Sequence, residues 1–288
     1  MSERIEVQKT YKTYVGGSFP RSESGHYYKV FDSEGDFLAN ACRCTRKDFR
    51  DAVLAARSAF DGWSSRSSYN RGQILYRIGE MMENRRDQFV KELGSVGFTK
   101  EEANADINSS IDRLIYYAGW TDKYQQVFGS INPVASAHFN FSVLEPTGVV
   151  SVLAPENSPL LGLVSVIAPI IAGGNTCVIH ASEQYPLASI SFAEVLNSSD
   201  VPGGVVNILT GKRSELVEHF SSHMDVNAIL YTDKMEKETK ILIDELASNN
   251  IKRVIKKEIQ DWYESDSESP YFIVDFQETK TTWHPIGF

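Results

Sequence analysis

The sequence predicts an α/β protein built on a parallel sheet that helices cover on both faces. Four short β-rich runs alternate with helical stretches, a pattern typical of right-handed βαβ units. The segment from Leu160 to Ala172 is apolar nearly all round, which indicates a buried crossover helix between two of the strands. The four runs are Val149-Val-Ser-Val-Leu-Ala, Thr176-Cys-Val-Ile-His, Val205-Val-Asn-Ile-Leu and Ala228-Ile-Leu-Tyr.

The N-terminal third predicts a strand and turn followed by three helices. Two glycines in Tyr14-Val-Gly-Gly-Ser-Phe provide the turn. A capping box at Thr45 and Asp48 begins the first helix, and the second is expected from about Tyr69 to Leu93. The third carries a stripe at helical spacing that indicates core packing, formed by Ile107, Ile111, Leu114, Ile115 and Ala118.

Two further strands are expected outside the parallel sheet. Phe139-Asn-Phe-Ser-Val-Leu alternates apolar and polar residues with period two, as a half-buried strand does. After the charged segment from Lys252 to Ser269, Tyr271-Phe-Ile-Val predicts a last strand that leads into the tail ending at Phe288.

Composition and charge exclude several classes of partner. The 288 residues hold 29 Lys and Arg against 38 Asp and Glu, a net charge of -9, so neither nucleic acid nor an anionic membrane is an expected partner. Three cysteines, Cys42, Cys44 and Cys177, do not form a disulfide framework and indicate a reducing compartment. The start lacks the apolar core of a signal peptide, and no apolar run is long enough to span a bilayer. We therefore expect a cytoplasmic protein.

Several blocks, in order and over nearly the whole chain, resemble the aldehyde dehydrogenase superfamily. The most specific are Glu145-Pro-Thr-Gly-Val-Val-Ser-Val-Leu-Ala-Pro-Glu-Asn-Ser-Pro159, Ala172-Gly-Gly-Asn-Thr176 and Val201-Pro-Gly-Gly-Val-Val-Asn-Ile-Leu-Thr-Gly211. Tyr69-Asn-Arg-Gly-Gln-Ile-Leu-Tyr-Arg and Trp283-His-Pro-Ile-Gly resemble, more narrowly, the second, cysteine-less half of the family 16 enzymes. The resemblance implies a Rossmann-like sheet flanked by helices, a small β oligomerisation extension and a missing catalytic domain.

In active members, the resemblance implies, a cysteine thiolate attacks the aldehyde and a glutamate activates water. No cysteine follows Cys177, which lies in a β-rich run and is interpreted as a buried structural thiol. The position of the general base falls on Lys257, beside the acid Glu258, and the glycines of that motif are missing. Asn157 matches the oxyanion asparagine but is interpreted as a turn former. The sequence therefore predicts no catalytic residue and a protein that is not an enzyme.

Cofactor binding is also not expected. The family's Lys-Pro-Ser-Glu, which holds the adenosine ribose, corresponds here to His180-Ala-Ser-Glu183, so His180 and Glu183 are the candidate vestigial contacts to NAD or NADP. On the pyrophosphate side, Asp233 brings a negative charge where the family has glycine, although Lys234 is a neighbouring cation. His219 and His223 share one helix face, but no acid or thiol completes a metal shell.

The tail resembles the superfamily's terminal oligomerisation strand and is expected to pair with the strand at 137–144. This reading assigns 1–130 and 146–265 to a degenerate NAD(P)-binding-like domain, and 131–145 with 271–288 to the oligomerisation element. The residues expected to carry assembly are Phe139, Phe141, Val143, Thr281 and Trp283. An edge strand that pairs only within the chain is the alternative.

The leading hypothesis is a catalytically inactive aldehyde dehydrogenase-like subunit with a structural, oligomerisation or regulatory role. Its expected partner is a second copy or an active aldehyde dehydrogenase subunit. The alternatives are a module that retains weak nucleotide binding and a half-enzyme completed by the cysteine of another chain.

Overall fold

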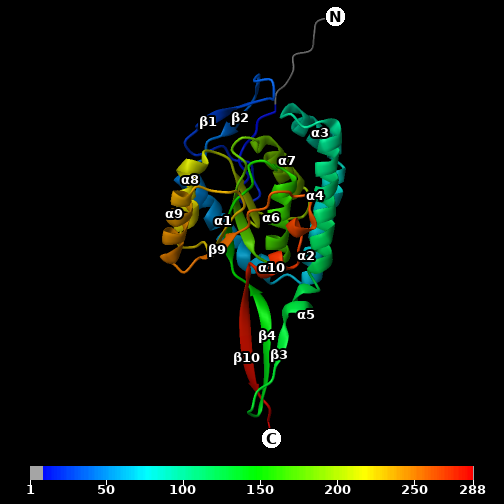
Figure 1. The fold of residues 1–288 in the computed structure, drawn as a ribbon, viewed down its shortest axis with the longest axis vertical. Helices are drawn as coiled ribbons and strands as arrows, with labels where there is room; N and C mark the ends of the chain where they lie inside the picture. The colour runs from blue at the N-terminus through cyan, green and yellow to red at the C-terminus, as the bar shows by residue number, and fades with distance from the viewer. Residues whose placement is uncertain (1–8, 288) are drawn as a thin grey trace, which may run out of the picture.

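A five-stranded parallel sheet forms the centre of the computed structural model, which describes residues 9–287 (Figure 1). The strand order is β7-β6-β5-β8-β9, and every neighbouring pair is parallel. The α/β class and the parallel sheet predicted from the sequence are therefore confirmed. The strands are β5 (Val149–Leu153), β6 (Thr176–His180), β7 (Val206–Leu209), β8 (Ala228–Tyr231) and β9 (Arg253–Lys256).

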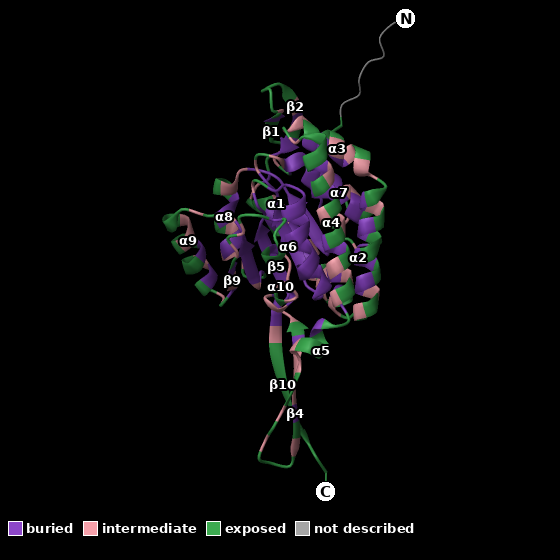
Figure 2. Ribbon diagram, turned by 45° about the vertical axis from the view of Figure 1, so that its right-hand side comes forward, coloured by how far each residue is buried: buried purple, intermediate pink, exposed green. Residues whose placement is uncertain are grey.

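Helices cover both faces of this sheet, and the two covering layers have separate cores. One layer contains α1 (Arg46–Ser64), α8 (Arg213–Ser222) and α9 (Lys237–Ser248), packed on side chains such as Val178 and Ile229. The other contains α2 (Ser68–Glu83), α3 (Arg86–Ser95), α4 (Lys100–Trp120), α6 (Leu161–Ala172) and α7 (Pro186–Asn197). Every residue of α6 is buried, as its all-round apolar sequence predicts (Figure 2).

A three-stranded antiparallel sheet projects from the body, and we call it the stem. It has the order β10-β4-β3, from β3 (Ser130–Asn132), β4 (His138–Pro146) and β10 (Gln277–Pro285), and follows the short helix α5 (Tyr124–Phe128). Figure 1 shows the stem pointing away from the sheet and the C-terminus lying near its tip. The tail thus pairs with the strand at 138–146, with Trp283 opposite Asn140.

Several elements were not predicted, among them β3, α5, an N-terminal hairpin and β9. The hairpin of β1 (Tyr27–Phe31) and β2 (Phe37–Cys42) packs beside the body, whereas the predicted strand at Tyr14 makes only isolated bridges, to Ile208 and within its turn. The strand β9 lies in the charged segment where the apolar pattern is weak, and only Ile255 of its four residues is buried.

The structure corrects two predicted elements. Tyr271–Val274 forms the one-turn helix α10 and not a strand, because Pro270 holds φ at -63° and starts a helical turn. The helix expected from Tyr69 to Leu93 is two helices, since the chain turns at Asn84 and Arg85 and α3 starts at Arg86.

The segment from 257 to 276, which we call the strap, connects β9 to β10 and packs against α4 and α6. It contains the 3-10 turn Ser265–Ser267 and α10, and its buried side chains Trp262, Ile273 and Phe276 belong to the core that surrounds α6. Arg113 of α4 anchors it by donating to the carbonyl of Trp262 (3.1 Å) and to the hydroxyl of Ser267 (3.0 Å).

None of the helices within residues 9–287 combines the length and the apolar character needed to cross a bilayer. Residues 1–8, on which part of the localisation expectation depends, lie outside the described residues.

Candidate functional site

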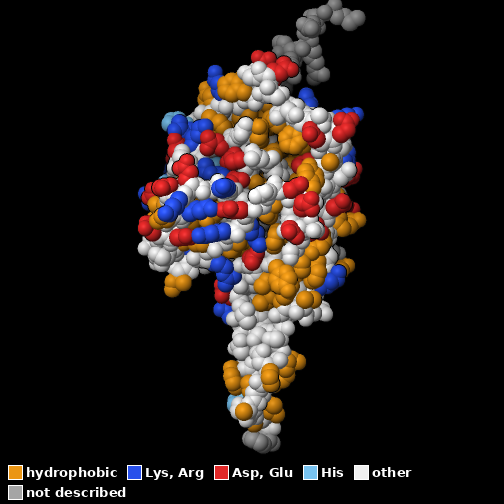
Figure 3. All heavy atoms as spheres, viewed as in Figure 1, with side chains coloured by type: hydrophobic (Ala, Val, Ile, Leu, Met, Phe, Trp, Pro, Cys, Tyr) orange, Lys and Arg blue, Asp and Glu red, His pale blue; other side chains and the backbone are white. Residues whose placement is uncertain are grey.

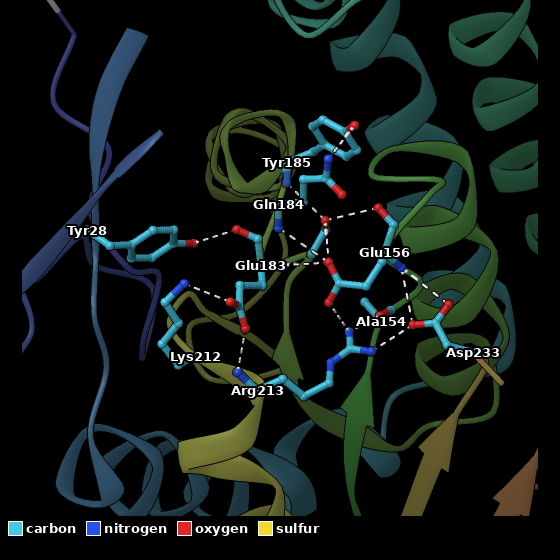
Figure 4. A network of polar contacts seen from close by, with 10 residues as sticks. Tyr28, Ala154, Glu156, Glu183, Gln184, Tyr185, Lys212, Arg213 and Asp233 are labelled. Carbon is cyan, nitrogen blue, oxygen red and sulfur yellow. Dashed lines mark hydrogen bonds and ion pairs between the residues drawn. The ribbon is translucent and has the colours of Figure 1, made fainter. Parts of the chain in front are cut away.

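The loops that follow four parallel strands meet at one edge of the sheet and carry charged side chains that pair with one another. In open α/β sheets, ligands bind at this carboxyl edge. Here the loops after β5, β6, β7 and β8 contribute Glu156, Glu183, Lys212 with Arg213, and Asp233. Figure 4 shows these side chains turned toward one another.

Arg213 lies at the centre of this group and joins two loops. Its Nη2 lies 2.7 Å from Glu156 Oε1, and its Nη1 lies 2.6 Å from Asp233 Oδ2. It also donates to the carbonyl of Ala154. The Arg213 side chain is 17% exposed, so these ion pairs are shielded from solvent more than ordinary surface pairs are. We call Glu156, Arg213 and Asp233 the crossbar.

The second carboxylate oxygen of Glu156 is bound by the turn that precedes α7. Glu156 Oε2 accepts from Ser182 Oγ at 2.9 Å, from the Glu183 amide at 2.8 Å and from the Gln184 amide at 3.3 Å. The Glu156 amide donates in turn to the Asp233 carboxylate at 3.2 Å. Both oxygens of Glu156 are thus held by partners within the chain.

Glu183 has the same kind of internal partners. Its carboxylate accepts from Lys212 Nζ at 2.7 Å and from the Arg213 amide, at the start of α8, at 2.9 Å. Burial alone would raise the pKa of Glu183, but the bonds from Lys212 and the Arg213 amide outweigh it and leave that pKa below its ordinary value. Tyr28 of the β1–β2 hairpin donates to the Glu183 carbonyl at 3.2 Å.

A hollow of about 910 Å³ opens beside these residues, large enough for a small organic ligand. Its wall combines the hairpin with the loops of the carboxyl edge. The lining residues include Tyr28, Phe31, Glu156, Glu183, Tyr185 and Lys212.

The structure separates His180 from Glu183, the two residues proposed as vestigial cofactor contacts. Glu183 lines the hollow, whereas His180 is fully buried at the end of β6, edge-on to the ring of Phe220. Neither ring nitrogen of His180 has a hydrogen-bond partner in the described part of the chain. Burial, with a smaller effect of Arg213, lowers the pKa of His180 to about 3, so the ring is neutral near pH 7.

The residues at the positions of the family's catalytic groups lie in different surroundings. Asn157 is exposed and lines a smaller hollow of about 430 Å³, together with Glu258. Glu258 pairs with Lys240, and this bond lowers its pKa. Lys257 pairs with Asp275 at 2.7 Å. Cys177 is fully buried and burial raises its pKa, as expected for a structural thiol.

His219 and His223 line a groove beside the start of α1, together with Arg46. Burial is the largest cause of a lowered pKa in both rings. Among residues 9–287, no group of three or more His, Cys, Asp or Glu side chains is placed to hold a metal ion.

The five residues assigned to assembly all lie on the stem, but on two faces. Directly opposed residues of antiparallel strands share a face. Phe139, Phe141 and Val143 therefore lie on one face with Ile131, whereas Thr281 and Trp283 lie on the other, opposite Ser142 and Asn140.

Sequence reasoning missed the crossbar. Asp233 was predicted only as a negative charge at a glycine position of the family, and no pattern in the sequence predicted that Arg213 pairs with both Asp233 and Glu156. One signal could have indicated this pairing: Arg213 is opposite in charge to Glu156 and Asp233, and all three residues follow strands of the predicted parallel sheet.

Known proteins match this chain over most of its length. The family profile described as aldehyde dehydrogenase family matches residues 19–257. A cytosolic aldehyde dehydrogenase 1 of Elephantulus edwardii is 32% identical over 258 residues, which are 87% of this chain and 50% of that protein. The cytosolic 10-formyltetrahydrofolate dehydrogenase of Mus musculus is 30% identical over 88% of this chain and 28% of its own length.

Solved structures agree with these sequence matches. The NAD+ complex of the aldehyde dehydrogenase from Bacillus cereus has a TM-score of 0.81 and 27% identity, covering 86% of this chain and 50% of that one. The NAD+ complex of betaine aldehyde dehydrogenase from Staphylococcus aureus gives 0.80 and 27% over 86% of this chain and 49% of that one. This chain thus spans about half of the single-enzyme relatives it matches and 28% of the 10-formyltetrahydrofolate dehydrogenase.

The comparisons overturn one expectation from the sequence, that the protein is not an enzyme. The matched relatives are named as dehydrogenases, which are enzymes, so the family points to an enzyme. The expectation depended on absent motifs in a chain that spans about half of the length of these relatives, and such an absence does not decide what the protein does.

Proposed function

Because this chain belongs to the aldehyde dehydrogenase family, we propose that it acts as a subunit of an aldehyde dehydrogenase-type assembly and that the stem joins it to another chain. The partner is a second copy or another aldehyde dehydrogenase chain. The role within the assembly is structural or regulatory, and the proposed location is the cytoplasm, in keeping with relatives named cytosolic.

Exposed apolar side chains of β3 and β4, which we call the apolar face, carry this proposal. The β10 residues beside them on this side of the stem are Lys280, Thr282 and His284. Ile131 is 74% exposed and Phe139 is 43% exposed, and Phe141 and Val143 continue the same face. Figure 3 shows hydrophobic side chains gathered on the stem surface, away from the charged body. Contiguous apolar surface of this kind favours association, because a partner would remove it from water.

The opposite face of the stem carries the exposed ring of Trp283, and its side chains from Asn132, Asn140, Ser142 and Thr281 are polar and bonded to one another. Asn132 donates to the Asn140 side chain at 2.6 Å and to the Ser142 hydroxyl at 2.9 Å, and Ser142 bonds Thr281 across the next strand at 2.9 Å. These bonds join all three strands and hold the sheet that presents the apolar face in one conformation, which lowers the entropy cost of docking a partner.

Sedimentation velocity over a range of concentrations tests this proposal. We expect the wild-type protein to associate and Phe139→Lys to shift it toward the monomer, because a charge on the apolar face opposes burial. Thr279→Lys is the matched control: Thr279 is exposed on the opposite face, opposite Leu144, and its replacement should leave association unchanged. Circular dichroism checks that both variants are folded.

A wild-type protein that stays monomeric at every concentration, and that does not co-sediment with an added aldehyde dehydrogenase chain, would rule out the assembly role. Equal weakening by Phe139→Lys and Thr279→Lys would also contradict it, because the effect would then not depend on the apolar face.

A further inference from the structure

At the carboxyl edge of the sheet, the carboxylate of Glu156 occupies a position whose surrounding groups are suited to bind an anion. A carboxylate or phosphate at such an edge is typically held by backbone N–H groups of the loops and by a nearby cation. The amides of Glu183 and Gln184, the hydroxyl of Ser182 and the guanidinium of Arg213 converge here, and all four donate to the carboxylate of Glu156 or pair with it.

We infer that Glu156 is a specificity-determining residue that keeps phosphate-bearing ligands out of the crevice by occupying their binding position with its own carboxylate. A phosphate could use the same amides, hydroxyl and guanidinium only after Glu156 has left. Glu156 thus acts as an internal competitor for anionic ligands, which distinguishes it from a residue that only packs at the edge.

The crossbar strengthens this exclusion, because it neutralises the cation that would attract a phosphate. Arg213 is paired with Glu156 on one side and with Asp233 on the other, and Lys212 is paired with Glu183. The network holds three carboxylates against two cations, a net charge of -1, so an incoming anion meets like charge. Since Arg213 is mostly buried, this repulsion is screened less than on an open surface.

The crossbar also divides the edge physically. The hollow of about 910 Å³ lies beside Glu183 and Tyr28, and the hollow of about 430 Å³ lies beside Asn157 and Glu258. Glu156 lines the first hollow and Asp233 the second, and Arg213 joins the two residues. A ligand that extends across both hollows must therefore break these ion pairs, whereas a neutral ligand confined to the larger hollow need not.

Calorimetric titration with inorganic pyrophosphate and, separately, NAD+ tests this inference on the full chain. We expect weak binding or none by the wild-type protein and tighter binding of pyrophosphate by Glu156→Ala, by roughly tenfold or more, because the amides are vacated and one repelling charge is removed. Glu156→Gln should show a smaller gain, since the amide oxygen still occupies the position without its charge. Asp233→Asn should increase affinity less than Glu156→Ala does, because it removes a repelling charge while Glu156 still occupies the position.

The matched control is Glu215→Gln. Glu215 lies on the same helix as Arg213 and is likewise paired with an arginine, Arg43, but it is outside the crossbar. It loses the same charge without emptying the position, so its affinity for pyrophosphate should equal that of the wild type. Adding Arg213→Gln to Glu156→Ala should remove the gain.

Three results would overturn the inference: tight pyrophosphate binding by the wild type, no gain in Glu156→Ala and Asp233→Asn, or an equal gain in Glu215→Gln. Thermal unfolding monitored by circular dichroism shows which variants are folded. If Glu156→Ala does not fold, the comparison of Glu156→Gln and Asp233→Asn with Glu215→Gln decides the question.

Discussion

The guanidinium of Arg213 reaches from the start of α8 to the carboxylate of Asp233 in the loop after β8, with Nη1 2.6 Å from Oδ2. This contact joins residues on two loops of the carboxyl edge, and Glu156 completes it from a third. The charges of the edge therefore satisfy one another.

Replacement of Arg213 by alanine should destabilise the fold. It leaves the carboxylates of Glu156 and Asp233 close together without a cation, and we expect a loss of about 2 kcal/mol, less than for a fully buried pair because both acids are partly exposed. Urea denaturation measures it. The control is Lys240→Ala, which removes only the partly exposed partner of Glu258 and should cost clearly less, because solvent screens this pair. Equal losses in the two variants would contradict the central role of Arg213.

The strap should depend on Arg113. This side chain is 4% exposed, donates to Trp262 and Ser267, and pairs with Glu268 at 3.0 Å. Arg113→Ala removes the donor to the Ser267 carbonyl and one of the two donors to the Trp262 carbonyl, and it leaves Glu268 without its cation. We therefore expect a loss of about 3 kcal/mol and faster proteolytic cleavage within 257–276. Arg86→Ala, which breaks an exposed pair with Glu83, is the control. Unchanged cleavage of the strap in Arg113→Ala would show that other contacts hold it.

The three cysteines should not react in the folded protein. Cys42, Cys44 and Cys177 are all buried and free, and burial raises the pKa of Cys44 and Cys177, so few thiolates form. We expect no rapid reaction with a thiol-specific disulfide reagent at pH 8 and reaction of all three in urea. Rapid labelling of Cys177 in the native state would contradict the burial described here.

Acid should destabilise the fold through His180. Burial lowers the pKa of His180 to about 3, below its ordinary value, so the unfolded chain binds this proton more readily than the folded one. The free energy of unfolding therefore carries its full contribution from the neutral ring above about pH 6.5. It decreases as the pH falls toward 3, by up to about 1.4 kcal/mol per pH unit. His180→Leu cannot take up this proton.

Stability measured from pH 7 to pH 4 for the wild type and His180→Leu checks this expectation. The difference between the two proteins should change in favour of the variant as the pH falls. Parallel curves would show that the proton on His180 is not linked to unfolding.

Local patterns were enough to predict much of the architecture. The four apolar runs became β5 to β8 and the all-round apolar segment became α6, because burial on both faces selects such sequences wherever they lie. The tail pairs with the strand at 138–146 as expected. The pattern failed at Tyr271–Val274, where β-forming residues follow Pro270, and at β9, where charged residues form a strand at the edge of the sheet.

What the sequence determined by itself was the class of the fold, the order of the four central strands β5 to β8 and the apolar residues of the stem, since these depend on periodicity and composition within short segments. Only the tertiary structure decided that Glu156 and Asp233 meet Arg213, that His180 turns into the core while Glu183 lines the hollow, and that Trp283 lies on the face opposite Phe139. These outcomes depend on how parallel strands bring distant loops to one edge and on strand register, and neither is encoded in any single segment.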